Sequence, residues 1–309
     1  TWRKRKEGLM KILIAEDDKT SFFMLESLLE KWGYTVIAVR DGKEAFKLLN
    51  GDEPPLLAIL DWMLPGMSGP EICASLREER EGNGKPYQYI IILTIKEEKE
   101  YVVEGLKAGA DDYLTKPFDS QELQMRLRVG ERILHLQEQL RTAALYDDLT
   151  GLLNRGAVIE RLECELNRSW RTGVPLSIAL LDIDHFKEVN DTYGHITGDL
   201  VLREIARRMK AVIRPYDSVG RYGGEEFLLI FPGLSGKDAD TICERVRSAI
   251  MEKPFLPWKS KEDQTPFFIS ASLGLCEVPA VCETIDRVLT NADDALYRAK
   301  RSGRNRVSR

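Results

Sequence analysis

Residues 56–61 read LLAILD, an apolar run that ends in an acid, and residues 62–69, WMLPGMSG, turn the chain away from it. A short, uninterrupted apolar run is typical of a strand that is covered on both faces. The same unit, a run followed by an amphipathic stretch, recurs from residue 11 to residue 116. The other runs are KILIA (11–15), YTVIAV (34–39), YIIIL (89–93) and DYL (112–114). Short strands that alternate with helices predict an α/β fold with a doubly wound, five-stranded parallel sheet.

The composition of the 309-residue chain predicts two globular domains, because one domain takes about 150 residues. Hydrophobic residues make up 43% and charged residues 31%, which excludes a disordered polymer and a membrane bundle. The formal charge of −5 argues against a nucleic-acid partner. No run approaches the roughly 18 apolar residues of a membrane span, so we expect a cytoplasmic protein.

The five cysteines include no C-x-x-C pair, so we expect them to be reduced and mostly buried. Residues 1–9, TWRKRKEGL, are basic and patternless. We expect them to be a tail or a non-native remnant, with Met10 as the natural start. They do not resemble a signal peptide, because Lys11 interrupts the apolar run that follows and acids come directly after it.

Acids, a hydroxyl and a lysine stand where the runs of the first half end. They are Glu16, Asp17, Asp61, Thr94 and Lys116. Each residue alone is equally well a helix cap. The carboxyl ends of parallel strands meet at one edge, however, and three carboxylates repel one another there unless a cation such as Mg²⁺ lies among them. A carboxylate can also attack phosphorus while a lysine and a hydroxyl stabilise the transferred group.

These residues resemble the receiver domain of response regulators, and we place this domain at residues 10–118. The shared motifs are AEDD (15–18), LDWMLPGMSG (60–69), LT (93–94) and DDYLTKPF (111–118). The resemblance implies that Asp61 accepts phosphate from a sensor histidine kinase, and that Glu16, Asp17 and Asp61 hold one Mg²⁺. Glu16 stands where many relatives have aspartate, which a flexible metal site tolerates.

The same resemblance assigns roles to three further residues. It implies that Thr94 and Lys116 contact the phosphoryl group and that Tyr113 is the aromatic switch residue. It also implies that the Lys116–Pro117 bond is cis, as is frequent in this family.

A helical connector is expected at residues 119–146. Its apolar residues are spaced 4, 3, 4, 3 in the manner of a coiled coil, namely Val129, Ile133, Leu136, Leu140 and Ala143. We favour a parallel two-stranded coiled coil. The alternative is a single helix that packs this stripe on its own domain. Gly130 lowers helix stability by about 1 kcal/mol relative to alanine, which makes it a candidate bend.

Residues 147–309 change to an α+β pattern. We expect helices near 155–171, 199–213, 237–251 and 286–301, strands at 176–184 and 267–275, and a hairpin at 221–231. Asp182 closes the first strand, and Glu225 and Glu226 follow a Gly-Gly turn in RYGGEEFLLIF. A lone acid there is usually a cap, and a Gly-Gly pair is usually only a turn. If the hairpin pairs beside the Asp182 strand, the carboxylates meet and should bind divalent metal.

Two further clusters suggest a nucleotide ligand. Asn190 and Asp199 follow Asp182 in the sequence, and an ionised aspartate accepts from the N1–H and N2–H₂ donors that guanine has and adenine lacks. Lys300 and Arg304 lie in YRAKRSGRN (297–305), and we take them as candidate phosphate contacts. Lys187 and His195 are further candidates. The alternative for YRAKRSGRN is a solvated basic tail.

Together these motifs resemble the GGDEF domains of diguanylate cyclases, here as GGEEF. The resemblance runs from DDLTGLLNR (147–155) to the last residue and includes LDIDHFKEVND (181–191). It implies that Asp182, the Ile183 carbonyl and Glu225 hold two Mg²⁺, with Glu226 also at the metal site. The catalytic residues would be Asp182, Glu225 and Glu226.

The resemblance also implies which residues bind the substrate GTP. Asn190 and Asp199 would read the guanine, and the triphosphate would face Lys187, His195, Lys300 and Arg304. Phe186 is a further expected substrate contact.

The motif RPYD supplies Arg214 and Asp217, five residues or more before the Gly-Gly turn. An arginine fork can bind guanine O6 and N7 while an aspartate accepts from N1–H and N2–H₂. The pair matches the inhibitory product site of the family, and Arg245 resembles a secondary contact to the product. The alternative is a surface ion pair.

The sequence thus predicts a phosphorylation-activated diguanylate cyclase that joins two GTP into cyclic di-GMP, releases two pyrophosphates and is inhibited by its product. By resemblance each cyclase domain is half an active site, so we expect a homodimer through the receiver, the connector and facing cyclase domains. One alternative is a catalytically silent sensor that binds GTP or cyclic di-GMP and relays phosphorylation. Another is a cyclase with a mononucleotide product.

Overall fold

The computed structural model describes residues 10–79, 86–95, 99–257, 265–278 and 284–309. The expected tail at residues 1–9 and Cys282 lie outside the described residues. The chain divides into two compact units, residues 1–140 and 141–309. Among the helices that the structure describes, none is long and apolar enough to cross a membrane.

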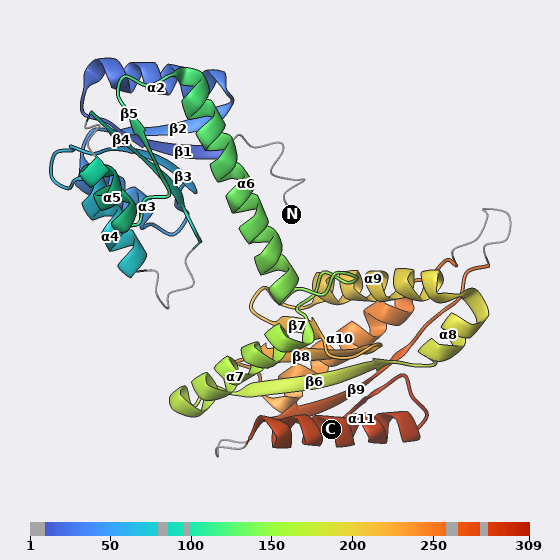
Figure 1. The fold of residues 1–309 in the computed structure, drawn as a ribbon. Helices are drawn as coiled ribbons and strands as arrows, with labels where there is room; N and C mark the ends of the chain where they lie inside the picture. The colour runs from blue at the N-terminus through green and yellow to red at the C-terminus, as the bar shows by residue number, and fades with distance from the viewer. Residues whose placement is uncertain (1–9, 80–85, 96–98, 258–264, 279–283) are drawn as a thin grey trace. The chain divides into compact units, whose positions relative to one another are not determined.

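The first unit contains the expected five-stranded parallel sheet (Figure 1). Its order is β2-β1-β3-β4-β5, and every neighbouring pair is parallel. The strands are β1 (Met10–Ala15), β2 (Tyr34–Val39), β3 (Leu57–Asp61), β4 (Tyr89–Thr94) and β5 (Asp112–Thr115). All residues of β3 and β4 are buried, which is why these two strands read as continuous apolar runs.

Helices cover both faces of this sheet (Figure 1). Leucines of α2 (Lys19–Lys31) and α6 (Ser120–Leu145) pack on one face. Residues of α3 (Gly42–Leu49) and α4 (Gly69–Glu78) pack on the other face, where α5 (Lys99–Lys107) also lies. Side chains cap these helices locally: Asp18 accepts from the Ser21 N–H to start α2, and Ser68 forms a capping box with Glu71 to start α4.

Helix α6 packs on the sheet of the first unit with a different face from the predicted stripe. Its buried residues are Leu123, Leu127, Gly130 and Leu134. In the predicted stripe, Leu136 is 51% and Leu140 70% exposed, so the alternative in which this whole stripe covers its own domain is wrong. Gly130 has a packing role, because a Cβ there would lie 2.4 Å from the ring of Tyr89.

The second unit contains a five-stranded mixed sheet of order β10-β9-β6-β8-β7. Its strands are β6 (Leu176–Ile183), β7 (Ser218–Arg221), β8 (Glu226–Pro232), β9 (Ala271–Glu277) and β10 (Val307–Ser308). The central strand β6 is antiparallel to both of its neighbours and is buried along its whole length.

Helices cover both faces of this sheet as well. One core cluster contains side chains of α8 (Phe186–Tyr193), α9 (His195–Val212) and α10 (Gly236–Glu252). The other contains side chains of α7 (Arg155–Thr172) and α11 (Ile285–Arg301). Cys73, Cys243 and Cys276 are free and buried, while Cys164 is free and exposed.

Four elements of the second unit differ from the sequence-based expectation. The expectation lacks helix α8 and strand β10, α9 begins at His195 rather than near residue 199, and β9 begins at Ala271 rather than at residue 267. Phe267 instead forms an isolated bridge with Phe255, which keeps it out of β9.

Candidate functional site

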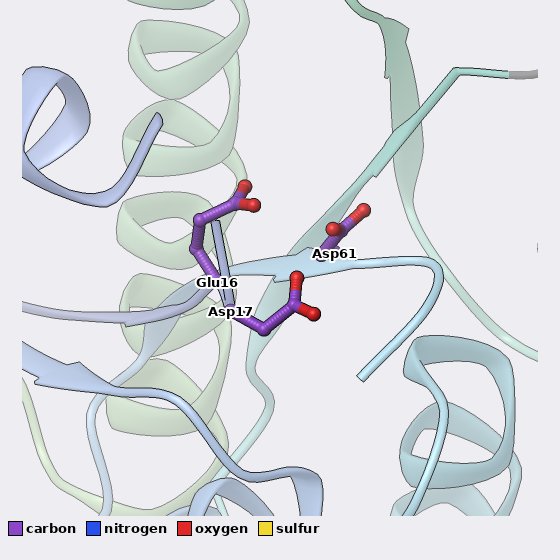
Figure 2. Close-up of side chains that lie close together, drawn as sticks. All are labelled: Glu16, Asp17 and Asp61. Carbon is purple, nitrogen blue, oxygen red and sulfur yellow. The ribbon is translucent and has the colours of Figure 1, made fainter. Parts of the chain in front are cut away.

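Three carboxylates gather at the carboxyl edge of the first sheet (Figure 2). Glu16 and Asp17 follow β1, and Asp61 is the last residue of β3. One oxygen from each side chain can be chosen so that all three lie within 4.8 Å of one another. Glu16 is completely buried, whereas Asp17 is exposed. The arrangement brings together the three acids that the sequence singled out.

Lys116 bridges two of these acids. Its Nζ lies 2.6 Å from Glu16 Oε2 and 3.0 Å from Asp61 Oδ2. Burial raises the pKa of the Glu16 carboxyl, and the charge of Asp61 adds to this rise, while the hydrogen bond from Lys116 opposes it. A crowded, partly buried set of carboxylate oxygens fits Mg²⁺, because the cation relieves their mutual repulsion.

The remaining predicted residues of the receiver lie at the same end or next to it. Thr94 is the last residue of β4 and is 2% exposed. Tyr113 lies in the neighbouring strand β5 and is half-buried. The Lys116–Pro117 bond is cis.

A second group of carboxylates lies at the end of β6. In the antiparallel pairing of β6 with β8, Asp182 is directly opposite Glu226. The Ile183 N–H donates to the Glu225 carbonyl at 3.3 Å. The hairpin therefore lies beside the Asp182 strand, which is the condition under which the sequence predicts a metal site.

An ion pair that sequence reasoning missed braces this hairpin. Arg221 Nη1 lies 3.1 Å from Asp147 Oδ2, and Arg221 Nη2 donates to the Gly224 carbonyl at 2.8 Å. Asp147 in turn accepts from the Thr150 hydroxyl and backbone N–H. The available signals were the position of Arg221 directly before YGGEE and the acid that opens DDLTGLLNR.

The side chains at the end of β6 form a group of carboxylates that contains one lysine. Lys300 Nζ lies 2.8 Å from Asp182 Oδ2. Burial raises the pKa of Asp182; Lys300 and Arg304 oppose this rise. Burial likewise raises the pKa of Glu225, and the charges of Asp182 and Glu226 raise it further. Carboxylates that repel one another in this way are a donor set suited to divalent cations.

The two acidic groups differ in how tightly they are assembled. Within the described part of the chain, the receiver acids are the one set of three such ligands whose oxygens approach within 4.8 Å. In both groups a lysine already pairs with an acid, Lys116 in the first unit and Lys300 at the end of β6.

The expected guanine contacts lie on α8 and α9. Asn190 is half-buried on α8, and Asp199 is exposed on α9. Gly198 lets the two helices approach closely, because a Cβ there would lie 2.0 Å from Asn190 Oδ1. Phe186 is 5% exposed and belongs to the hydrophobic core, so the structure gives it a packing role, and its contact with GTP stays a prediction.

The expected phosphate contacts are exposed or half-exposed side chains. Lys187, His195 and Arg304 are exposed, and the Lys300 side chain is 34% exposed. Arg304 follows α11, and its charge lowers the pKa of Asp182, so it acts on the same end of β6. The buried Asp184, two residues beyond Asp182, is a second residue that sequence reasoning left without a role.

The RPYD motif lies between α9 and β7. Arg214 Nη2 is 2.5 Å from Asp217 Oδ1, and the Asp217 side chain has no exposed surface. The Arg214 guanidinium also lies 4.5 Å from the centre of the Tyr216 ring. Arg245 is exposed on α10. In this structure Arg214 and Asp217 thus pair with each other, and Arg214 Nη2 also donates to the Pro232 carbonyl at 3.2 Å.

Comparison with known proteins agrees with both units. Residues 144–306 match the family model "Diguanylate cyclase, GGDEF domain", and residues 12–128 match the response regulator receiver domain. The response regulator PleD of Caulobacter vibrioides is 34% identical over 266 residues, which cover 84% of this chain and 57% of PleD. The diguanylate cyclase DgcP of Pseudomonas aeruginosa is 38% identical, with 75% of this chain and 36% of DgcP covered. The chain thus spans less than two thirds of the length of either relative.

A solved structure adds a match in three dimensions. The coiled coil and GGDEF domain of DgcB from Caulobacter crescentus, in complex with c-di-GMP, align with a TM-score of 0.55 and 35% identity. The alignment covers 62% of this chain and 99% of that one. The chain therefore belongs to the GGDEF family, and its N-terminal unit is a response regulator receiver domain.

Proposed function

We propose that this protein is a diguanylate cyclase whose activity is controlled by phosphorylation of Asp61. The observation that carries the proposal is the register of β6 and β8, which sets Asp182 directly opposite Glu226 and bonds Ile183 to the Glu225 carbonyl. This register gathers carboxylates beside Lys300 at a partly open strand end. It is an arrangement suited to holding a triphosphate and cations.

Each residue of the cluster has a proposed role. Two Mg²⁺ held by Asp182, the Ile183 carbonyl and Glu225 would lower the pKa of the attacking hydroxyl and neutralise charge on the α-phosphate. Glu226 is the third carboxylate of this metal site. Asn190 and Asp199 bind the guanine, where an ionised carboxylate selects against adenine. The triphosphate lies against the basic side chains, namely Lys187, His195, Lys300 and Arg304.

The proposed reaction balances in two identical steps. The 3′-oxygen of one GTP forms a bond to the α-phosphorus of the other, the bond from that phosphorus to pyrophosphate breaks, and the hydroxyl proton is lost. Repeating the step in the opposite direction closes the ring and releases a second pyrophosphate. Each domain supplies one GTP, so two copies of the chain must face each other.

The receiver would supply the control. Asp61 accepts a phosphoryl group from a sensor histidine kinase beside one Mg²⁺ held with Glu16 and Asp17, and Lys116 and Thr94 then contact that group. Tyr113 transmits the change. The connectors would pair in parallel, and this pairing would remove the exposed apolar residues Leu136 and Leu140 of α6 from water.

Product inhibition is proposed to act through Arg214, Asp217 and Arg245. Binding of cyclic di-GMP would replace the internal ion pair with guanine contacts from the same two side chains. We place this activity in the cytoplasm, where GTP is available.

The decisive experiment measures cyclic di-GMP formation from GTP and Mg²⁺ against protein concentration, with and without beryllofluoride. We expect turnover to rise faster than linearly with concentration, and beryllofluoride to raise it further. Asp61→Asn should lose the beryllofluoride response and keep basal turnover, while Glu225→Gln should abolish synthesis. A chain that binds GTP but forms no cyclic di-GMP under any of these conditions would be a sensor, and a mononucleotide product would indicate the other kind of cyclase.

A further inference from the structure

Asp184 is a buried carboxylate that the roles proposed above do not use. It is 5% exposed and lies just past the end of β6. Its two oxygens accept three hydrogen bonds, from the Ser270 hydroxyl at 2.6 Å, the Ser272 hydroxyl at 2.7 Å and the Asn305 backbone N–H at 3.0 Å. A buried carboxylate is unfavourable unless donors satisfy it, so these contacts fix its position.

The third contact reaches a turn that follows α11. Arg304 and Asn305 both have left-handed backbones, with φ values of 57° and 48°. Non-glycine residues are strained in this region, and the strain persists only where surrounding contacts hold it. Here the Arg304 N–H donates to the Ala299 carbonyl at 3.1 Å, and the Asn305 N–H donates to Asp184.

A second contact holds the same turn from another element. Arg247 Nη1, on α10, donates to Asn305 Oδ1 at 2.8 Å. The turn is therefore fixed from two directions, by the end of β6 and by α10. By contrast, the Arg304 guanidinium is exposed and makes no hydrogen bond or ion pair with any residue that the structure describes. Its backbone is held while its side chain is left open to a ligand.

We propose that Asp184 is a positioning residue for Arg304: by holding the Asn305 N–H it fixes the left-handed turn that presents the Arg304 guanidinium to the triphosphate at the end of β6. The inference rests on the proposed GTP site. Asp184 itself does not touch the nucleotide. Its hydrogen bond fixes the backbone of the turn that carries Arg304. The Arg304 side chain therefore loses less conformational entropy when it binds the triphosphate, which favours binding.

The test measures binding of 3′-deoxy-GTP with Mg²⁺ to the full chain by calorimetry. This analogue lacks the attacking hydroxyl, so it binds without reacting. We expect Asp184→Asn and Arg304→Ala each to weaken binding by about tenfold or more. The double variant should bind within about twofold of Arg304→Ala alone, because the contribution of Asp184 passes through Arg304. Asp286→Asn, on the exposed first turn of α11, is the matched control and should bind like the wild type.

Two results would overturn the proposal. One is an Asp184→Asn variant that binds the analogue within about twofold of the wild type. The other is a double variant in which the two losses of binding free energy add, which would mean that Asp184 affects binding independently of Arg304. If Asp184→Asn does not fold, Asn305→Ala tests the turn by its other contact: it keeps the backbone N–H that donates to Asp184 but loses the side-chain oxygen that accepts from Arg247. Affinity losses that add between Asn305→Ala and Arg304→Ala would then refute the role of this turn in presenting Arg304.

The same measurements separate this inference from the proposed function. A wild-type chain that binds 3′-deoxy-GTP but makes no cyclic di-GMP would contradict the cyclase activity. The comparison of the single and double variants of Asp184 and Arg304 would still decide the role of Asp184. A wild-type chain that does not bind the analogue would overturn both.

Discussion

Replacing Gly198 with alanine should impair the proposed guanine site without unfolding the protein. A Cβ at this position would lie 2.0 Å from Asn190 Oδ1 and 3.3 Å from Phe186 Cζ. An ordinary carbon–oxygen contact is about 3.3 Å, so the Asn190 amide must move by roughly 1.3 Å. The Phe186 ring is buried in the core and cannot give way easily. The gain of alanine over glycine in a helix, about 0.5–1 kcal/mol, offsets part of the crowding.

We expect the KM for GTP to rise by about tenfold, and by up to about a hundredfold, because a displacement of about 1 Å at a binding group can have that effect. The preference for GTP over inosine triphosphate, which lacks the 2-amino group, should change as well. Steady-state formation of cyclic di-GMP at graded nucleotide concentrations measures both quantities. Thermal unfolding of the same samples shows whether the variant is intact.

Gly156→Ala is the matched control for this prediction. Gly156 also lies near the start of a helix, α7, but the nearest atom to its Cβ would be Asn154 Oδ1 at an ordinary 3.5 Å. This control should keep the wild-type KM. A folded Gly198→Ala variant whose KM stays within about twofold of the wild type would refute the assignment of Asn190 to the guanine.

Three further predictions concern stability and metal binding. Gly130→Ala should lower the free energy of unfolding by about 1–3 kcal/mol, because the new Cβ would lie 2.4 Å from the Tyr89 ring. Denaturant titration measures this free energy, and an unchanged unfolding midpoint would contradict the packing role of Gly130. Hydrogen bonds from Arg207 and Arg208 lower the pKa of Glu204 to about 2, so this carboxylate stabilises the fold above its ordinary pKa, and the stabilisation is lost as the pH falls toward about 2. Glu204→Gln should therefore be less stable than the wild type by on the order of 1 kcal/mol at pH 7, with a difference that shrinks below about pH 4.5 in urea titrations; a difference that grows in acid would refute this. Asp17→Asn should weaken Mg²⁺ binding to the receiver by about tenfold or more. Tryptophan fluorescence measures this affinity, because Trp62 adjoins Asp61. An unchanged affinity would show that Asp17 is not a ligand of the metal.

The parallel sheet of the receiver could be predicted because strands that are buried on both faces consist almost entirely of apolar residues. Strands such as β4, with every residue buried, read as uninterrupted apolar runs. The convergence of Glu16, Asp17 and Asp61 then follows from topology, since the carboxyl ends of parallel strands share an edge. The pairing of Asp182 with Glu226 was expected only on condition that the hairpin lay beside β6.

Helix starts without a side-chain cap were harder to predict. Helix α8 buries only Phe186 and Val189, and the left-handed residue before it, His185, does not cap the helix backbone with its side chain. Helix α9 likewise begins after Gly194 without a side-chain cap. Tertiary packing decides where such helices begin.

The packing face of α6 could not be chosen from the sequence because two stripes share the same spacing. Leu123, Leu127, Gly130 and Leu134 repeat in steps of 4, 3 and 4, just as the predicted stripe does. Spacing identifies a helix, but only the tertiary fold selects which stripe is buried. Contacts between distant parts of the chain, such as Asn305 with Asp184, leave no local pattern at all.

The closed ion pair between Arg214 and Asp217 has a consequence for any ligand of that motif. The Asp217 carboxylate has no exposed surface, so a ligand reaches it only after the arginine swings away. The free energy of that opening is the same whatever ligand arrives, and it is subtracted from every affinity alike. At the proposed product site, the Arg214–Asp217 ion pair would therefore set the ligand concentration at which the site fills, and selectivity among ligands would come from the contacts made after Arg214 has moved.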